Sequence, residues 1–126
     1  MVKEDNVYIL DDDNSARKGL SRLLRVAGFN VLSFSNASSF LNKLKPNASG
    51  TLVMDLRMPG LSVEELSKEL KCRESNIKII VVSGDDNDVS KKIAKNIGAK
   101  GFFRKPVDGT ALIDAVNWLL KNGHEK

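Results

Sequence analysis

The sequence has few of the residues on which several common kinds of functional site depend. Its 126 residues include one cysteine, one histidine and three prolines. The lone Cys72 excludes an internal disulfide and suits a reducing compartment, and the lone His124, in a polar tail, is not expected to be a ligand or a catalyst. Apolar runs are too short to span a membrane, and the N-terminus shows no signal-peptide pattern. We therefore expect one cytoplasmic domain of residues 1–126 that has no membrane partner.

An excess of basic residues is the one unusual feature of the composition. Lysine and arginine number 20 against 16 aspartates and glutamates, which gives a formal net charge of +4 and a sequence pI of about 9.3. A basic face can attract nucleic acid. The basic residues are scattered, however, without the interleaved aromatic residues or the helix-turn-helix pattern of nucleic-acid binders. We interpret the excess as a solvated basic surface.

Strand-like and helix-like segments alternate five times along the chain. Strands are expected at Asn6–Leu10, Val31–Phe34, Thr51–Met54, Lys78–Val82 and Gly101–Arg104. Between them, apolar residues recur at helical spacing, as in Val89, Ile93 and Ile97, which we expect to face inward. Strands that alternate with helices of this length predict an α/β fold, a single (βα)5 doubly wound parallel sheet with helices on both faces.

Four of these strands run into polar residues that suit phosphate chemistry. In chain order, the residues are Asp11-Asp12-Asp13, Asp55, Ser83 and Lys105-Pro106. Ligands of open parallel sheets bind outside the carboxyl ends of the strands, so these side chains are expected at one edge of the sheet. Several carboxylates, a hydroxyl and an ammonium group together suit a divalent metal ion and a phosphoryl group.

In this order, the motifs resemble the receiver domain of two-component response regulators, the CheY-like superfamily. The matching motifs are Asp11-Asp12, Asp55 within the segment 54–60, Ser83-Gly84 and Lys105-Pro106, so the resemblance covers essentially the whole chain. It implies a flavodoxin-like sheet with strand order 2-1-3-4-5. It also implies a phosphoprotein of a phosphorelay, which is a signalling domain that assists its own phosphorylation and dephosphorylation and not an enzyme.

The resemblance assigns the acidic residues to the phosphoryl chemistry. Asp55 would be the phosphoacceptor, because a carboxylate can form an acyl phosphate that hydrolyses readily. Mg²⁺ is the implied cofactor, since close carboxylates repel one another unless a cation neutralises them. Asp12 and Asp55 would bind it directly, together with the backbone carbonyl of Arg57, and Asp11 would act through a water. The third acid, Asp13, is better explained as the N-terminal cap of the first helix.

Two further motif residues and an aromatic side chain are implied to sense the phosphoryl group. Lys105 would contact its oxygens opposite the metal, aimed by a cis peptide bond before Pro106, and Ser83 would donate its hydroxyl to them. Phe102 would be the switch residue. It would turn inward on phosphorylation and alter the surface formed by the fourth helix, the fifth strand and the fifth helix.

The resemblance also implies partners and a control on signal lifetime. The expected partner is a sensor histidine kinase or a phosphotransfer protein, which would supply the phosphoryl group from a phosphohistidine. Other expected partners are an output domain, or DNA contacted through a C-terminal domain beyond this chain, and a second copy of the chain in a homodimer formed on phosphorylation. Arg57 and Asp85, at the mouth of the pocket, would tune how long the phosphate survives.

Two other interpretations remain open from the residues alone. A haloacid-dehalogenase-type phosphohydrolase would use Asp11 as its nucleophile and Asp13 as its general acid/base, although the usual order of its later motifs is reversed here and Asp55 goes unexplained. A receiver-like module could instead bind partners without being phosphorylated, and failure to bind Mg²⁺ would favour that interpretation.

Overall fold

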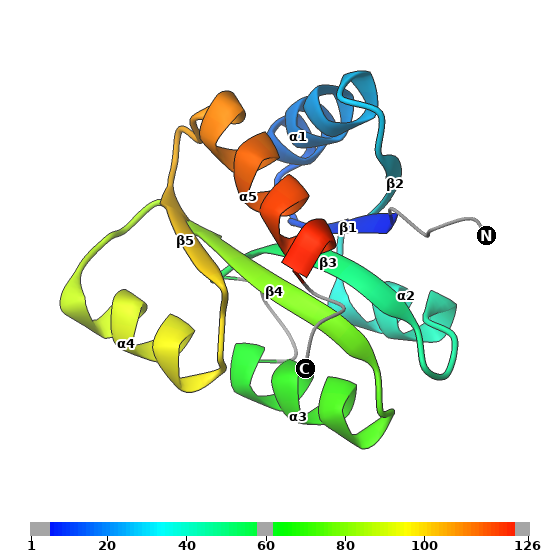
Figure 1. Ribbon diagram of the computed structural model, residues 1–126. Coiled ribbons are helices and arrows are strands. Elements are labelled where there is room, and N and C mark those ends of the chain that lie inside the picture. The colour runs from blue at the N-terminus through cyan, green and yellow to red at the C-terminus, as the bar shows by residue number, and fades with distance from the viewer. Residues whose placement is uncertain (1–5, 58–61, 123–126) are drawn as a thin grey trace.

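A parallel sheet forms the centre of the computed structural model (Figure 1). The structure describes residues 6–57 and 62–122. Within them the strands are β1 (Asn6–Leu10), β2 (Asn30–Phe34), β3 (Ser49–Asp55), β4 (Asn76–Ser83) and β5 (Gly101–Arg104). Their order in the sheet is β2-β1-β3-β4-β5, which confirms the predicted doubly wound topology. The expected strand bounds lie within two residues of the observed ones, as is usual for boundaries read from a pattern.

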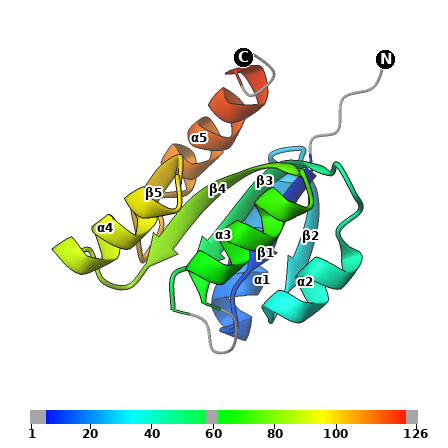
Figure 2. The same ribbon diagram turned by 90° about the horizontal axis from the view of Figure 1, so that it is seen from below.

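Helices cover both faces of this sheet. They are α1 (Asn14–Val26), α2 (Ala37–Lys43), α3 (Val63–Cys72), α4 (Asp88–Asn96) and α5 (Gly109–Asn122). Figures 1 and 2 show α2, α3 and α4 on one face and α1 and α5 on the other. Among the described helices, none has the length and apolar character needed to cross a bilayer.

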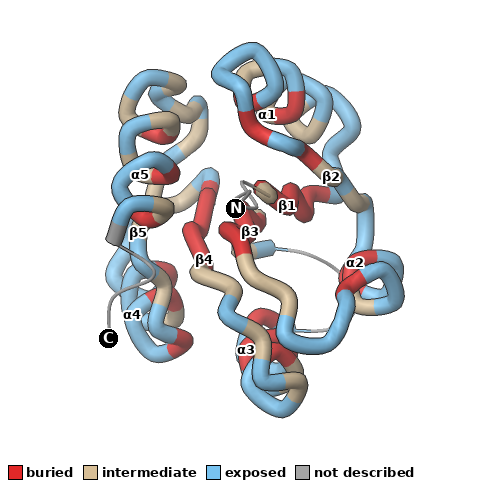
Figure 3. Tube along the Cα trace, turned by 45° about the vertical axis from the view of Figure 1, so that its right-hand side comes forward, coloured by how far each residue is buried: buried red, intermediate tan, exposed pale blue. Residues whose placement is uncertain are grey.

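The central strands contribute to two hydrophobic cores, one on each face. In β3, Leu52 and Met54 pack towards α2, α3 and α4, whereas Val53 between them packs with side chains of α1 and α5. Successive side chains of a strand point to opposite faces, so the apolar runs of β1, β3 and β4 are buried on both sides (Figure 3). Burying one such side chain fully contributes about 1.5–3 kcal/mol to folding, and the strands therefore form a firm frame for the residues at their ends.

Polar side chains fix the starts of the helices that flank the carboxyl edge of the sheet. Asp13 caps α1, because its Oδ1 accepts hydrogen bonds from the N–H groups of Ser15 at 3.0 Å and Ala16 at 3.4 Å. This confirms the capping role predicted for Asp13. The N-terminus of α4 has a similar cap, in which Asn87 accepts from the N–H of Ser90 at 2.8 Å.

One prediction about the inner face of α4 is wrong. Val89 is 68% exposed, and the residues buried on this helix and at its C-terminal end are Ser90, Ala94 and Ile97. Each helical residue advances by about 100°, so Val89 lies about 80° round the helix from Ile97 and falls outside the buried stripe. The observed buried residues are four and then three positions apart, which keeps them on one face of the helix. The predicted residues are four and four apart, so the first and last of them do not lie on the same face.

Candidate functional site

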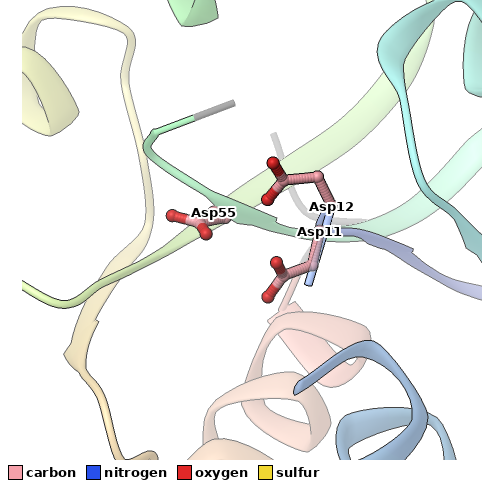
Figure 4. Close-up of side chains that lie close together, drawn as sticks. All are labelled: Asp11, Asp12 and Asp55. Atoms are coloured by element: carbon pink, nitrogen blue, oxygen red, sulfur yellow. The ribbon is translucent and has the colours of Figure 1, made fainter. Parts of the chain in front are cut away.

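The polar residues predicted at the strand ends gather at the carboxyl edge of the sheet. Asp11 and Asp12 follow β1, Asp55 ends β3, Ser83 ends β4 and Lys105 follows β5. The parallel register aligns these ends, since Leu10 pairs with Met54, Asp55 with Val82 and Ser83 with Arg104. Figure 4 shows the side chains of Asp11, Asp12 and Asp55 extending to the same side of the strand ends. One carboxylate oxygen from each of the three lies within 4.8 Å of the others.

Asp11 is the most deeply buried of these acids. Its side chain is 2% exposed. Oδ1 accepts a hydrogen bond from the N–H of Asp13 at 3.0 Å, and Oδ2 accepts one from Lys105 Nζ at 3.2 Å. Burial raises the pKa of the Asp11 carboxyl, and the nearby Asp55 charge adds to the rise, while the Asp13 amide and the Lys105 ammonium only partly offset it.

Asp55 lies beside Asp11 and shares the same lysine. Its Oδ1 accepts from the N–H of Arg57 at 3.0 Å, and its Oδ2 accepts from Lys105 Nζ at 3.1 Å. The side chain is 12% exposed, so solvent and small solutes reach Asp55 more readily than Asp11. Of these two neighbouring acids, Asp55 is therefore the one more accessible to a reactant.

Lys105 bridges the two carboxylates from the end of β5. Its backbone N–H donates to the carbonyl of Ser83 at 2.8 Å, and the peptide bond to Pro106 is cis, as expected. Burial alone lowers the pKa of Lys105, but its hydrogen bonds to Asp55 and Asp11 and the charges of both acids outweigh that effect, and the pKa is raised. Lys105 therefore remains a cation at neutral pH.

The charge and chemistry of the cluster suit a hard divalent cation. Asp12 is exposed and adds a third carboxylate to those of Asp11 and Asp55, and one lysine leaves two negative charges of the three without a neutralising partner in the site. Oxygen ligands of this kind, from one or two carboxylates with water, are what Mg²⁺ uses. Asp13 is not a member of this group among the described residues, because it caps α1.

Sequence comparison places the chain in a known family. A family profile described as "Response regulator receiver domain" matches residues 7–117. The chain belongs to the response regulator receiver family.

Known relatives of this receiver domain include longer regulators. It is 40% identical over 115 residues to the response regulator protein TodT of Pseudomonas putida, covering 91% of this chain and 51% of that protein. It is 37% identical over 120 residues to the transcriptional regulatory protein FixJ of Azorhizobium caulinodans, covering 95% and 57%. The crystal structure of full-length FixJ from B. japonicum matches with a TM-score of 0.86 and 32% identity, over 98% of this chain and 61% of that one. The chain thus spans about half the length of the curated relatives it matches.

Ser83, which was predicted to donate its hydroxyl, lies close to Asp85 and Arg57 at the mouth of the site in the receiver domain. Ser83 is fully buried, and its Oγ accepts a hydrogen bond from the N–H of Asp85 at 3.1 Å. The side chain of Asp85 forms an ion pair with Arg57. The Arg57 side chain is 71% exposed, and exposed pairs of this kind contribute about 1 kcal/mol at most. The role expected for the backbone carbonyl of Arg57 stays a prediction.

Phe102, the predicted switch residue, is partly buried on the inner side of α4. It packs against the core that includes Ala94 and Ile97. The predicted inward movement of Phe102 would therefore repack this core. Residues 58–60 of the Asp55 loop and His124, which figured in the sequence analysis, lie outside the described residues.

Two contacts near the site were missed from the sequence. Arg17 Nη1 donates to the backbone carbonyl of Asp11 at 2.8 Å and so ties α1 to the end of β1. Arg57 and Asp85 were placed at the mouth of the pocket but not paired with each other. Neither contact has a recognisable motif, because each joins segments that only the fold brings together.

Proposed function

We propose that the receiver domain accepts a phosphoryl group on Asp55, with Mg²⁺, from a phosphohistidine of a sensor histidine kinase or phosphotransfer protein. It acts as a phosphoacceptor in signalling and not as an enzyme on other substrates. The observation that carries this proposal is the position of Lys105 Nζ, 3.1 Å from Asp55 Oδ2 and 3.2 Å from Asp11 Oδ2. A fixed cation beside the acceptor oxygen neutralises the charge of an arriving phosphoryl group, which is the main requirement of phosphoryl transfer.

Asp55 is the acid best suited to attack phosphorus. Its Oδ1 is held by the N–H of Arg57, so Oδ2 forms the new bond while Lys105 moves to the phosphoryl oxygens. The bond from phosphorus to the donor imidazole nitrogen breaks, and that nitrogen keeps the electron pair. Water later attacks phosphorus, releases inorganic phosphate and restores the carboxylate.

The acidic cluster is proposed to hold the metal ion. Bound Mg²⁺ supplies a second positive charge to the phosphoryl oxygens. Asp12 and Asp55 would bind it with the carbonyl of Arg57, and Asp11 would act through a water. The net negative charge of this cluster supports the assignment, since ionised carboxylates this close need a cation.

The contacts of Asp11 and Asp13 do not favour the phosphohydrolase alternative. The side chain of Asp11 is 2% exposed, against 12% for Asp55, so a phosphoryl donor reaches Asp11 less readily. Asp13, which would have to be the general acid/base, has its Oδ1 occupied as the cap of α1. The presence of Asp11, Asp12, Asp55, Ser83 and Lys105 together argues against a receiver-like module that is never phosphorylated.

Phosphorylation is proposed to shift an existing equilibrium at the surface of α4, β5 and α5. Ser83 Oγ would exchange its contact with the Asp85 amide for a hydrogen bond donated to the phosphoryl group. Phe102 would then move further inward, by packing alone, because phenylalanine has no hydroxyl. We also propose an output domain, DNA contacted through such a domain, a homodimer formed on phosphorylation and a cytoplasmic location.

Intact-mass spectrometry after incubation with acetyl phosphate tests the acceptor. We expect one added phosphoryl group on the wild type in the presence of Mg²⁺ and none when EDTA replaces it. Asp55→Asn should remain unlabelled, while the exposed control Asp114→Asn on α5 should be labelled like the wild type. Label that persists in Asp55→Asn at the wild-type rate would refute the proposal, and turnover of phosphate esters lost in Asp11→Asn would support the phosphohydrolase.

A further inference from the structure

Five lysines lie around the loop between α4 and β5. This part of the surface is at the amino-terminal ends of β4 and β5, at the edge of the sheet opposite the acidic cluster. The five lysines line two shallow pockets that share Lys100. One pocket, of about 200 Å³, lies between α3, the start of β4 and this loop, and includes Lys71 and Lys78. The other, of about 240 Å³, lies between α4 and β5 and includes Lys91 and Lys95. We call the surface formed by these five lysines and the floors of the two pockets the Lys100 patch.

The lysines of the Lys100 patch form no ion pair within the described part of the chain. No aspartate or glutamate lines either pocket. The ion pairs among the described residues involve Arg57, Arg73, Arg104 and Lys105, and none involves a lysine of the patch. The nearby acid Glu69 of α3 is paired with Arg73. The patch therefore presents a concentrated positive potential to an acidic partner.

Both pockets have apolar floors beneath the lysines. The first includes Ile79, Ile97 and the half-buried Ile77, and the second includes Ala94 and the half-buried Phe102. A nucleic acid backbone would use the lysines through its phosphates and leave these floors uncovered. A protein segment that carries both acidic and apolar side chains would pair with the lysines and bury its apolar groups on the floors.

We propose that the Lys100 patch is a docking site for an acidic protein segment that places one apolar side chain in each pocket. The site is separate from the phosphoacceptor, because it lies at the amino-terminal ends of β4 and β5. Binding at the patch does not require phosphorylation of Asp55. Occupation of the pocket lined by Phe102 would, in addition, contact the side chain proposed above as the switch.

A labelled peptide that alternates glutamates with leucines tests the proposal by fluorescence anisotropy. Two comparison peptides replace the leucines with serine, or the glutamates with glutamine, and a DNA duplex of arbitrary sequence serves as a polyanion. We expect the acidic, apolar peptide to bind at least tenfold more tightly than each of the other three. The double variant Lys95→Glu/Lys100→Glu should weaken its binding at least tenfold. The matched variant Lys18→Glu/Lys43→Glu, whose lysines are exposed on α1 and α2, should bind as the wild type does.

Amide chemical shifts of the wild type provide a second readout that does not depend on any variant folding. Shifts caused by the peptide should be confined to the pocket residues of α3, α4 and the starts of β4 and β5. Equal loss of binding in both double variants, equal or tighter binding of DNA, shifts spread over the whole surface, or no binding at millimolar peptide would each overturn the proposal.

Discussion

Replacement of Lys105 by methionine isolates the charge that holds the acidic site together. Methionine keeps most of the length and apolar character of the lysine stem but removes the ammonium group that bridges Asp11 and Asp55. In the absence of metal, the variant leaves two neighbouring carboxylates, 2% and 12% exposed, without a neutralising partner. We expect the folded state to become less stable for this reason.

The size of the effect follows from the burial of the three groups. Removing one partner of a fully buried ion pair costs about 3–5 kcal/mol. Lys105 is 26% exposed, so water partly compensates for its loss, and we expect a lower cost of about 2–4 kcal/mol. For a domain of this size, 1 kcal/mol corresponds to about 4 °C, which makes the expected fall in Tm about 8–16 °C.

Thermal and urea denaturation in EDTA and in millimolar Mg²⁺ measure this effect. Because Lys105 and a cation compete for the same carboxylates, Mg²⁺ should raise the Tm of Lys105→Met by more than it raises the Tm of the wild type. Lys18→Met, at an exposed position of α1, is the control and should change Tm little, since lysine and methionine have similar helix propensities. A fall in Tm of less than about 2 °C in EDTA, or equal stabilisation of both proteins by Mg²⁺, would refute this reasoning.

Three further predictions concern pH and packing. The pKa of Lys105 is raised, so its stabilising effect is present below about pH 10.5 and is lost as the pH rises through its higher folded-state pKa. In EDTA, the difference in unfolding free energy between the wild type and Lys105→Met should therefore shrink above about pH 10.5, and a difference that stays constant would contradict this role of Lys105. Gly50→Ala should destabilise the fold by about 2 kcal/mol or more, because the new Cβ would lie 2.6 Å from the Asn6 carbonyl oxygen at a φ of +140°. Gly19→Ala, in an open position of α1, should instead stabilise it by about 0.5–1 kcal/mol, and urea denaturation that ranks the two variants the other way would be inconsistent with the strand packing. Ile97→Ala should cost about 2–4 kcal/mol and Val89→Ala less than about 0.5 kcal/mol, and similar costs for both would mean that the buried face of α4 is misassigned.

The sequence was most informative where local pattern and topology agree. Apolar runs that end in Asp11, Asp55 and Ser83 predict both the strands and the edge at which those residues meet, because parallel strands bring their carboxyl ends together. The cap at Asp13 was also predictable, since capping depends on a side chain and the amides two and three residues later.

Contacts between segments far apart in the sequence could not be predicted from local sequence patterns. The pairing of Arg57 with Asp85 depends on two loops that the sheet brings side by side. Val89 fits an apolar repeat in the sequence, and only the docking of α4 shows that it lies off the buried stripe. The lysines of the Lys100 patch are scattered from position 71 to position 100, so they read as a solvated basic surface until the fold gathers them around two pockets.

The identity of the phosphorylated residue is the most direct test of the proposed function. Protein treated with acetyl phosphate and Mg²⁺ can be reduced with borohydride, which converts an aspartyl phosphate to homoserine, and then mapped by peptide mass spectrometry. Our account predicts homoserine at position 55 and unmodified aspartate at positions 11, 12 and 13. Homoserine at position 11 with aspartate retained at position 55 would contradict it.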